Sequence, residues 1–230
     1  MTGPERSVAP DSVKVEIWSD VVCPWCYIGK RRFERALAGF EHRDEVDVRW
    51  RSFELDPRAP REVDEDPVER LARKYGMTRE AALAAQARVT ALAADEGLAY
   101  RLESARPANP LDAHRLLHLA AERGLQDAAE ERLFAAHFTE GRRLGDPETL
   151  VALAGDVGLD ESAARAALEG DAYAEAVVAD EVEAAELGIT GVPFVVIDRR
   201  YGISGAQPAE LILRALDQAW SEAHAAATDG

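Results

Sequence analysis

The feature that most constrains the fold of this chain is the Cys-Pro-Trp-Cys segment at residues 23–26, because it joins a strand pattern to a helix pattern. Before it, residues 13–18 alternate apolar and polar side chains, which is the period of a half-buried strand. After it, the apolar side chains of residues 24–40 fall mostly on one helical stripe. Residues 46–51 alternate again. A strand, a helix and a strand at these lengths predict a βαβ unit with parallel strands and a right-handed crossover.

The rest of the chain divides into a helical segment and a second strand-bearing segment. Residues 67–187 are rich in Ala, Glu, Arg and Leu at helical spacing and predict six or seven helices that pack as a lobe of their own. Two short runs at 193–197 and 201–204 predict antiparallel strands before a last amphipathic helix. We therefore predict an α/β fold with one mixed four-stranded sheet, built from residues 13–60 and 188–222 and interrupted by an all-α insertion at 61–187.

The only two cysteines of the chain, Cys23 and Cys26, have the spacing of a dithiol that can open and close. Residues three apart on a helix lie about 5–6 Å apart, and a disulfide needs Cα atoms at roughly 4.4–6.8 Å. A residue before proline avoids the α region, so we expect Cys23 just outside the helix and Pro24 at its first position. The free N–H groups and the helix dipole favour a Cys23 thiolate, although Trp25 offers no imidazole to strengthen the effect. Cys23 should then exchange with substrate, and Cys26, one turn inside, should resolve the mixed disulfide.

Composition and charge exclude several classes of function. The formal net charge of −16 argues against nucleic acid as a partner, since phosphate binding needs a basic surface. No run of about 18 apolar residues exists, so we expect no membrane span. Residues 1–10 carry no apolar signal core, so we expect a cytoplasmic protein, in which disulfides are usually transient and catalytic. Two cysteines cannot complete a four-thiolate zinc site.

The helix after the dithiol carries four cations: Lys30, Arg31, Arg32 and Arg35. Two interpretations are open. Most charge runs form a solvated helix face, whereas a mildly positive rim near the dithiol would favour a thiolate or an acidic thiol substrate.

Several segments resemble one family. Residues 19–29 (Ser-Asp-Val-Val-Cys-Pro-Trp-Cys-Tyr-Ile-Gly) resemble the active-site segment of the DsbA/FrnE-like thioredoxin-fold oxidoreductases, and residues 191–194 (Gly-Val-Pro-Phe) resemble their cis-proline loop. Residues 201–208 resemble the family's closing strand and helix start. Residues 109–116 resemble a segment in the helical insertion of this family and of the related 2-hydroxychromene-2-carboxylate isomerases. The resemblance implies a thioredoxin fold with a helical insertion and a DsbA-family disulfide oxidoreductase or isomerase.

The resemblance also implies the roles of site residues. It places the nucleophile at Cys23, the resolving thiol at Cys26 and the cis-proline at Pro193. The backbone of Val192 would then pair with an extended substrate beside the sulfurs. The alternative is that Pro193 starts a strand in trans, since only about 5–6% of X–Pro bonds are cis.

Four further residues are candidates for the substrate cleft. Asp20 is a candidate proton shuttle for Cys26, with a local turn or cap as the alternative. Asn109, His114 and Arg115 belong to the segment that resembles the family's insertion. A packing or surface role is the alternative for the last two of these.

Two groups of residues suggest no further chemistry. His118 follows His114 at a spacing that could hold a metal, but no carboxylate motif such as HExxH accompanies the pair, so we predict no metal site. We expect Trp18, Trp50 and Trp220 in the core.

Three functions remain open, and the intact cysteine pair favours the first of them. This is a thiol-disulfide oxidoreductase for protein or small-molecule substrates, with no cofactor beyond the Cys23–Cys26 disulfide and with glutathione as a candidate co-substrate. The second is a glutathione-dependent isomerase or transferase of a small aromatic or polyketide-like compound, whose relatives typically carry Ser at the nucleophile position. The third is a chaperone-like binding module. The sequence leaves the oligomeric state and the direction of the redox reaction open.

Overall fold

The computed structural model describes residues 12–61 and 65–228, and a mixed sheet of four strands lies at its centre. The strands are β1 (Val13–Ser19), β2 (Val46–Ser52), β3 (Phe194–Ile197) and β4 (Tyr201–Ser204). They are ordered β2-β1-β3-β4. The β1–β2 pair is parallel, and the β1–β3 and β3–β4 pairs are antiparallel. The predicted sheet, built from two distant parts of the chain, is confirmed.

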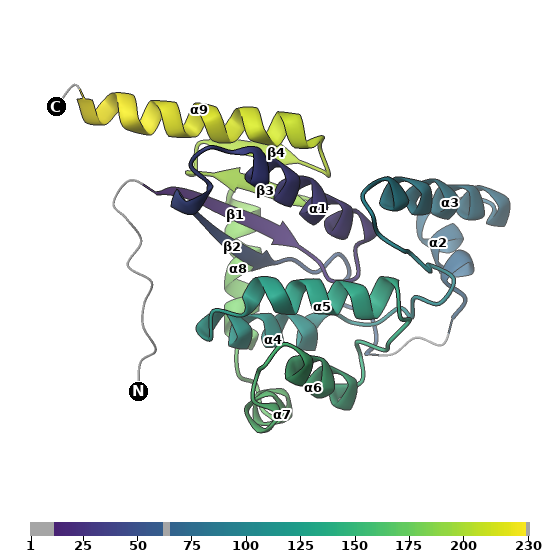
Figure 1. The fold of residues 1–230 in the computed structure, drawn as a ribbon. Helices are drawn as coiled ribbons and strands as arrows, with labels where there is room; N and C mark the ends of the chain where they lie inside the picture. The colour runs from purple at the N-terminus through teal and green to yellow at the C-terminus, as the bar shows by residue number, and fades with distance from the viewer. Residues whose placement is uncertain (1–11, 62–64, 229–230) are drawn as a thin grey trace.

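Two helices, α1 (Pro24–Gly39) and α9 (Ala209–Thr228), pack on one face of this sheet (Figure 1). Alternate side chains of β1 point toward them, so that Ile17 packs in one buried cluster with Phe33, Trp50 and Leu216. Burying each such side chain is worth roughly 1.5–3 kcal/mol. The alternation that predicted the first strand therefore reflects real burial on this face.

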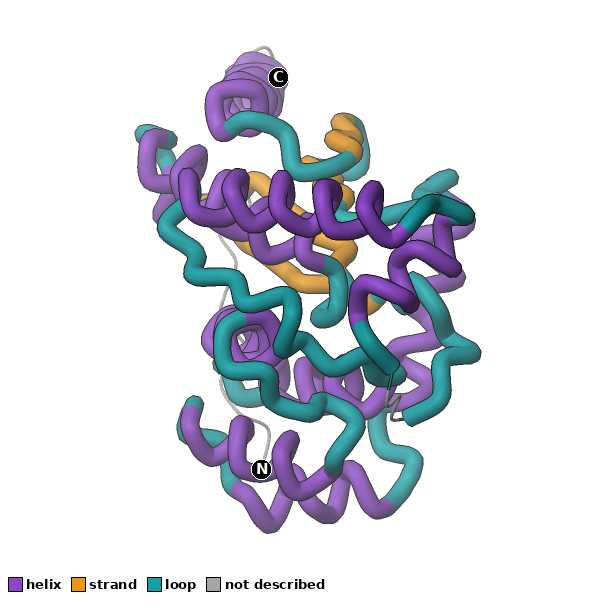
Figure 2. The backbone as a smooth tube through the Cα atoms, turned by 90° about the vertical axis from the view of Figure 1, so that its right-hand side faces the viewer, coloured by secondary structure: helices purple, strands orange, loops and turns teal. Residues whose placement is uncertain are grey.

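The opposite face of the sheet is covered by α8 (Ala174–Glu186). Trp18 points to this side, packs against Ala184 and donates its indole N–H to the Asp180 carbonyl at 2.9 Å. Strands in the middle and helices on either side give the layered thioredoxin-like arrangement (Figure 2). As predicted, Trp18 and Trp50 are buried in the core, and Trp220 packs against its edge.

Seven helices, α2 to α8, occupy the described part of the stretch between β2 and β3. Helices α4 to α7 share a second buried cluster that includes Leu116, Leu133 and Leu150. Helices α2 and α3 pack together around Val68 and Ala82 and lie beyond the N-terminal end of α1 (Figure 1). Besides a 3-10 turn at Arg43–Glu45, the remaining bounds are α2 (Pro67–Tyr75), α3 (Arg79–Asp95), α4 (Leu111–Glu122), α5 (Gln126–Phe138), α6 (Pro147–Asp156) and α7 (Glu161–Glu169).

Proline and aspartate fix where several of these helices begin. Pro67 and Pro147 stand at the first helical positions, directly after the capping residues Asp66 and Asp146. The Asp146 carboxylate accepts a hydrogen bond from the Thr149 N–H at 3.1 Å, which satisfies one of the free donors of a helix start.

No helix within residues 12–61 and 65–228 is both long and apolar enough to cross a bilayer. The segment 1–10, for which we expect no signal core, lies outside the described residues.

Candidate active site

Cys23 occupies the capping position of α1. Its backbone is extended (φ −94°, ψ 113°), and Pro24 follows at the start of the helix. Cys23 is 4% exposed and lines a cavity, whereas Cys26 is 1% exposed and lies outside that lining. The Cys26 N–H donates to the Cys23 carbonyl at 3.0 Å. The expected arrangement is therefore present, with one thiol at the helix start and the other one turn inside.

The Cys26 thiol holds its proton unusually firmly. Burial raises its pKa well above the ordinary value, and the hydrogen bond and charge of the neighbouring Cys23 raise it further. The charge of the nearby Asp20 carboxylate contributes in the same direction. No disulfide joins Cys23 and Cys26 in this structure. Since a thiolate and not a thiol attacks a disulfide, Cys26 must lose this proton before it can act.

The loop before β3 lies directly against Cys23. The Val192–Pro193 peptide bond is cis, as the resemblance implies, and the Cys23 thiol donates to the Val192 carbonyl at 3.7 Å. Helix α1 approaches this loop closely because position 29 is glycine. A Cβ atom there would lie 2.8 Å from the Pro193 Cγ atom.

Aromatic rings support the dithiol from the side of α5. Tyr27 stacks on Phe134 with ring centroids 4.8 Å apart, and Tyr100 stacks on Phe138 at 5.0 Å. The Tyr100 hydroxyl donates to the Pro24 carbonyl at 2.6 Å. Tyr100, which the sequence analysis did not single out, therefore holds the Cys-Pro-Trp-Cys segment in place.

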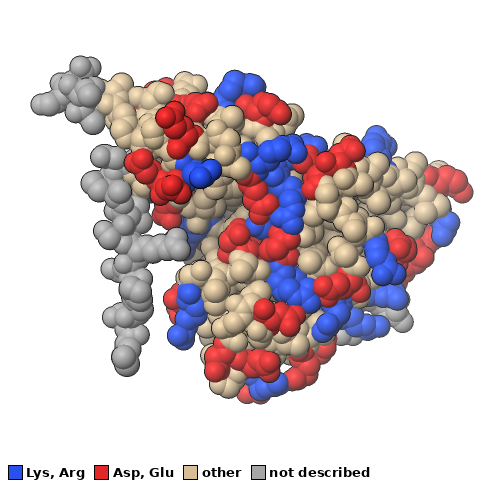
Figure 3. Space-filling model, viewed as in Figure 1, with Lys and Arg blue, Asp and Glu red and all other residues tan. Residues whose placement is uncertain are grey.

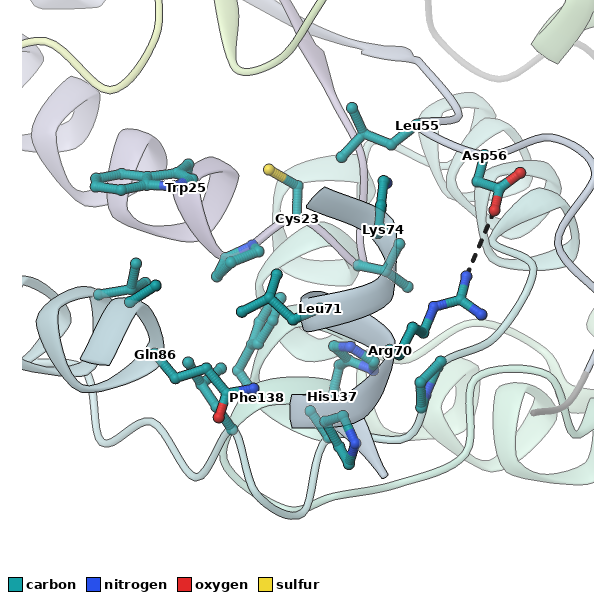
Figure 4. Close-up of a pocket in the computed structure, with 18 of the residues that line it drawn as sticks. Cys23, Trp25, Leu55, Asp56, Arg70, Leu71, Lys74, Gln86, His137 and Phe138 are labelled. Atoms are coloured by element: carbon teal, nitrogen blue, oxygen red, sulfur yellow. Dashed lines mark hydrogen bonds and ion pairs between the residues drawn. The ribbon is translucent and has the colours of Figure 1, made fainter. Parts of the chain in front are cut away.

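A cavity of about 630 Å³ opens beside Cys23 (Figure 4). Trp25 from α1, which is 39% exposed, Leu55, Leu71 from α2 and Phe138 from α5 give it mainly apolar walls. The cavity is bounded by α2 and α3 as well as by the dithiol segment. The site therefore includes helices that lie far from the cysteines in sequence.

Charged and titratable groups also line this cavity. Arg70, Lys74 and Arg88 are its cations, and Asp56 lies 3.5 Å from the Arg70 guanidinium. Burial lowers the pKa of His137 to about 4, so its ring is neutral near pH 7. Its Nδ1 atom has no hydrogen-bond partner among the described residues.

Asp20 anchors the loop that precedes the dithiol. Its carboxylate accepts hydrogen bonds from the N–H groups of Val22 at 3.1 Å and Leu55 at 2.8 Å. Its carbonyl accepts one from the Cys23 N–H at 2.9 Å. These contacts give Asp20 the turn role that was one of its two interpretations, while the proton-shuttle role stays a prediction.

Ionisable side chains are buried together behind Asp20. The His114 Nε2 atom lies 3.7 Å from Asp20 Oδ1. Burial opposes protonation of His114, but Asp20, Glu130 and Glu54 outweigh it and raise the pKa of the imidazole. Burial also raises the pKa of Glu130 to about 7, although the Ser19 hydroxyl donates to its carboxylate at 2.7 Å. His114 thus lies behind Asp20 and does not line the cavity. The sequence analysis did not single out Glu130, which is buried close enough to influence the pKa of His114.

Asn109 and Arg115 serve the architecture and do not line the cavity. The Asn109 amide donates to the carbonyls of Pro57 at 3.2 Å and Ala59 at 3.1 Å, which fastens the segment after β2 to the start of α4. The Arg115 guanidinium donates to the Ala172 carbonyl at 2.8 Å and to two carbonyls around the end of α7. These contacts support a packing role for Arg115 and not a place in the substrate cleft.

All four cations of α1 form ion pairs with carboxylates. Lys30 is 1% exposed and pairs with Glu34 and Asp127 at 2.6 and 2.7 Å. Arg31 contacts carboxylates of α1 and α5, and Arg32 and Arg35 both pair with a single glutamate at the end of α3. Blue and red side chains accordingly alternate over α1 and α5 (Figure 3). Lys30 is buried, so it belongs neither to a solvated helix face nor to a positive rim. The acidic partners of the four cations also offset the positive charge that such a rim would need.

His118 has partners that explain its position. Its Nε2 atom lies 3.1 Å from the Ser52 hydroxyl and 3.2 Å from Asp180 Oδ2. A search of the described residues finds no group of three or more His, Cys, Asp or Glu side chains arranged to hold a metal ion.

Known proteins resemble this chain over most of its length. The model of the DSBA-like thioredoxin domain family matches residues 14–217. The uncharacterized protein YwbO of Bacillus subtilis is 31% identical over 189 residues, which cover 81% of this chain and 87% of YwbO.

Solved structures share the fold. A probable DsbA oxidoreductase from Streptomyces coelicolor has 52% sequence identity and a TM-score of 0.88, with 91% of each chain covered. The cytosolic disulfide reductase DsbM from Pseudomonas aeruginosa, solved with glutathione, has 19% identity and a TM-score of 0.58, and 94% of this chain and 99% of DsbM are covered. The 52% identity to the Streptomyces coelicolor protein and the family match together assign the class of enzyme as well as the fold. The chain belongs to the DSBA-like thioredoxin domain family and is an enzyme of the DsbA-type disulfide oxidoreductase class.

Proposed function

We propose that this protein exchanges disulfides with thiol-containing substrates through Cys23 and Cys26. The observation that carries the proposal is the position of Cys23, which caps α1 at the edge of a cavity, 3.7 Å from the Val192 carbonyl. Cys26 lies one turn away and is shielded from solvent, as a resolving thiol should be.

The reaction has two steps that balance in atoms and electrons. The Cys23 thiolate attacks one sulfur of a substrate disulfide, forms a mixed disulfide and releases the first thiolate. The Cys26 thiolate then attacks the Cys23 sulfur, forms the Cys23–Cys26 disulfide and releases the second. The substrate gains two electrons, and the two thiol protons of the enzyme pass to the two products. The reverse sequence oxidises a dithiol substrate.

Neighbouring groups would assist these steps. We expect the Val192 backbone to pair with the substrate once Cys23 is bonded to it, since its carbonyl already accepts from the thiol. Pro24 fixes the helix start, and Trp25 lines the same cavity as Cys23. We expect Asp20 to accept the Cys26 proton, because its carboxylate is close enough to influence the pKa of that thiol.

The setting of the reaction is also part of the proposal. We expect a cytoplasmic enzyme, and the cytosolic reductase DsbM, solved with glutathione, is a structural relative that fits this expectation. No cofactor is required beyond the dithiol itself, and glutathione is a natural candidate for the thiol that recharges it.

Trapping of the mixed disulfide tests the proposal. A Cys26→Ser variant, mixed with a small disulfide, should accumulate one covalent adduct at Cys23 that mass spectrometry detects and reducing agent removes. The matched Cys23→Ser variant should form far less adduct, because Cys26 is buried. Equal adduct formation in both variants would show that Cys23 is not the nucleophile.

A further inference from the structure

We propose that the Cys23 site takes a small disulfide that carries a carboxylate, and that Lys74 and Arg88 recognise this carboxylate. The inference rests on the proposed dithiol function and adds to it the class of substrate. Three properties of the cavity carry it: its size beside a buried Cys23, its charge and an unpartnered imidazole in its wall.

The burial of Cys23 and the volume of the cavity limit the size of the substrate. Cys23 is almost fully buried, and its exposed edge faces the cavity that α2 and α3 help to bound. A cavity of about 630 Å³ falls within the range of roughly 300–1,000 Å³ in which proteins hold small molecules. The disulfide of a folded protein is attached to a body much larger than this space. The geometry therefore favours a small disulfide at Cys23.

Charge identifies the polar group of the substrate. The whole chain carries a net charge of −16, yet among the described residues three cations and a single carboxylate line this cavity. Asp56 is already engaged with Arg70. Neither Lys74 nor Arg88 has an ion-pair partner among the described residues, whereas the four cations of α1 are all paired. Two uncompensated cations beside a nucleophilic sulfur favour an anionic substrate.

His137 adds a polar group to the cavity wall. The ring is buried and neutral, and its Nδ1 atom is unpartnered among the described residues. Buried polar atoms are generally hydrogen-bonded in folded proteins, so this nitrogen suits an amide or carboxylate of a bound molecule. Apolar neighbours such as Leu71 and Phe138 suit the aliphatic part. A peptide-like acidic thiol combines these features, and oxidised glutathione is the probe that represents it.

Rates of a single turnover with the reduced protein test this inference without any recharging partner. The protein is mixed with anionic oxidised glutathione, neutral bis(2-hydroxyethyl) disulfide or cationic cystamine, and the remaining thiols are alkylated and counted by mass. The rate constant should be highest for glutathione and lowest for cystamine. The preference should shrink as salt rises, because ionic screening acts over about 8 Å at physiological ionic strength.

A matched pair of double variants isolates the two cations. Lys74→Gln with Arg88→Gln should lower the ratio of the glutathione rate constant to the neutral-disulfide rate constant by about three- to tenfold. Arg73→Gln with Arg79→Gln removes the same charge from the same two helices at positions outside the cavity lining. This control should leave the ratio unchanged. Equal losses in both variants, or no loss in the first, would overturn the inference.

Two further outcomes separate this inference from the proposed function. If the neutral disulfide oxidises both cysteines but glutathione shows no advantage, the dithiol function stands and the substrate class is wrong. Insulin, a folded protein with disulfides, serves as a fourth substrate in the same assay. If insulin reacts as fast as oxidised glutathione, the size limit is wrong. If no disulfide oxidises the pair, the dithiol function fails and this inference fails with it.

Discussion

Replacing Glu130 by Gln should change how the stability of the protein depends on pH. Burial raises the pKa of Glu130 to about 7 from 4.5. At about 1.4 kcal/mol per pKa unit, ionising this side chain costs the folded protein about 3 kcal/mol relative to the unfolded chain. Because the folded pKa is the higher one, the folded state binds more protons between these values. Stability is therefore unaffected well below pH 4.5, falls as pH rises through this window, and is lowest above pH 7.

The Glu130→Gln variant lacks this penalty, while its amide oxygen can still accept the Ser19 hydrogen bond. Urea unfolding of the reduced protein should show the variant gaining about 2 kcal/mol relative to wild type between about pH 5.5 and about pH 8. Groups that do not interact with Glu130 titrate in both proteins and cancel in the difference, whereas His114 loses the charge of Glu130 in the variant. Glu175→Gln, at an exposed position of α8, should show no such gain. A wild-type-to-variant difference that is the same at both pH values would refute the reasoning.

Three further substitutions test other parts of the site. Gly29→Ala places a methyl group 2.8 Å from Pro193 Cγ, so the free energy of unfolding should fall by about 1–3 kcal/mol. The control Gly39→Ala, whose methyl group lies at an ordinary 3.6 Å from Leu213, should show no such loss. Equal losses in both variants would contradict the tight contact. Tyr100→Phe removes the hydrogen bond to the Pro24 carbonyl and should lower stability by about 1 kcal/mol in the same assay; an unchanged unfolding midpoint would count against this support. Asp20→Asn removes a charge that raises the pKa of Cys26, so thiolate absorbance in a Cys23→Ser background should appear at lower pH than with Asp20 intact; a shift to higher pH would contradict the assignment.

The sheet and the start of α1 were predictable because their signals are local. Alternating side chains at residues 13–18 and 46–51 mark strands with one buried face, and Pro24 forces Cys23 out of the helix whatever the rest of the chain does. The cis geometry before Pro193 did not follow from the residues, since most prolines are preceded by trans bonds, and came from the resemblance.

The cavity was not predictable because its walls depend on tertiary packing. Helix α3 is so rich in Ala that its residues reveal no clear apolar face, and nothing near Arg88 in the sequence indicates that it lines the same cavity as Cys23. Lys30 is the opposite case: a Lys-Arg-Arg run suggests solvent, but its carboxylate partner Asp127 lies on a distant helix and allows burial. Contacts between residues far apart in the sequence decided both outcomes.

An equilibrium titration in glutathione buffers, with thiol trapping and mass readout, tests the central claim most directly. The dithiol account predicts that the two trappable thiols disappear and return together with one definable midpoint, and that Cys23→Ser or Cys26→Ser abolishes this transition. A pair that never closes, or a stable adduct with a single glutathione, would contradict the account and favour the glutathione-dependent isomerase.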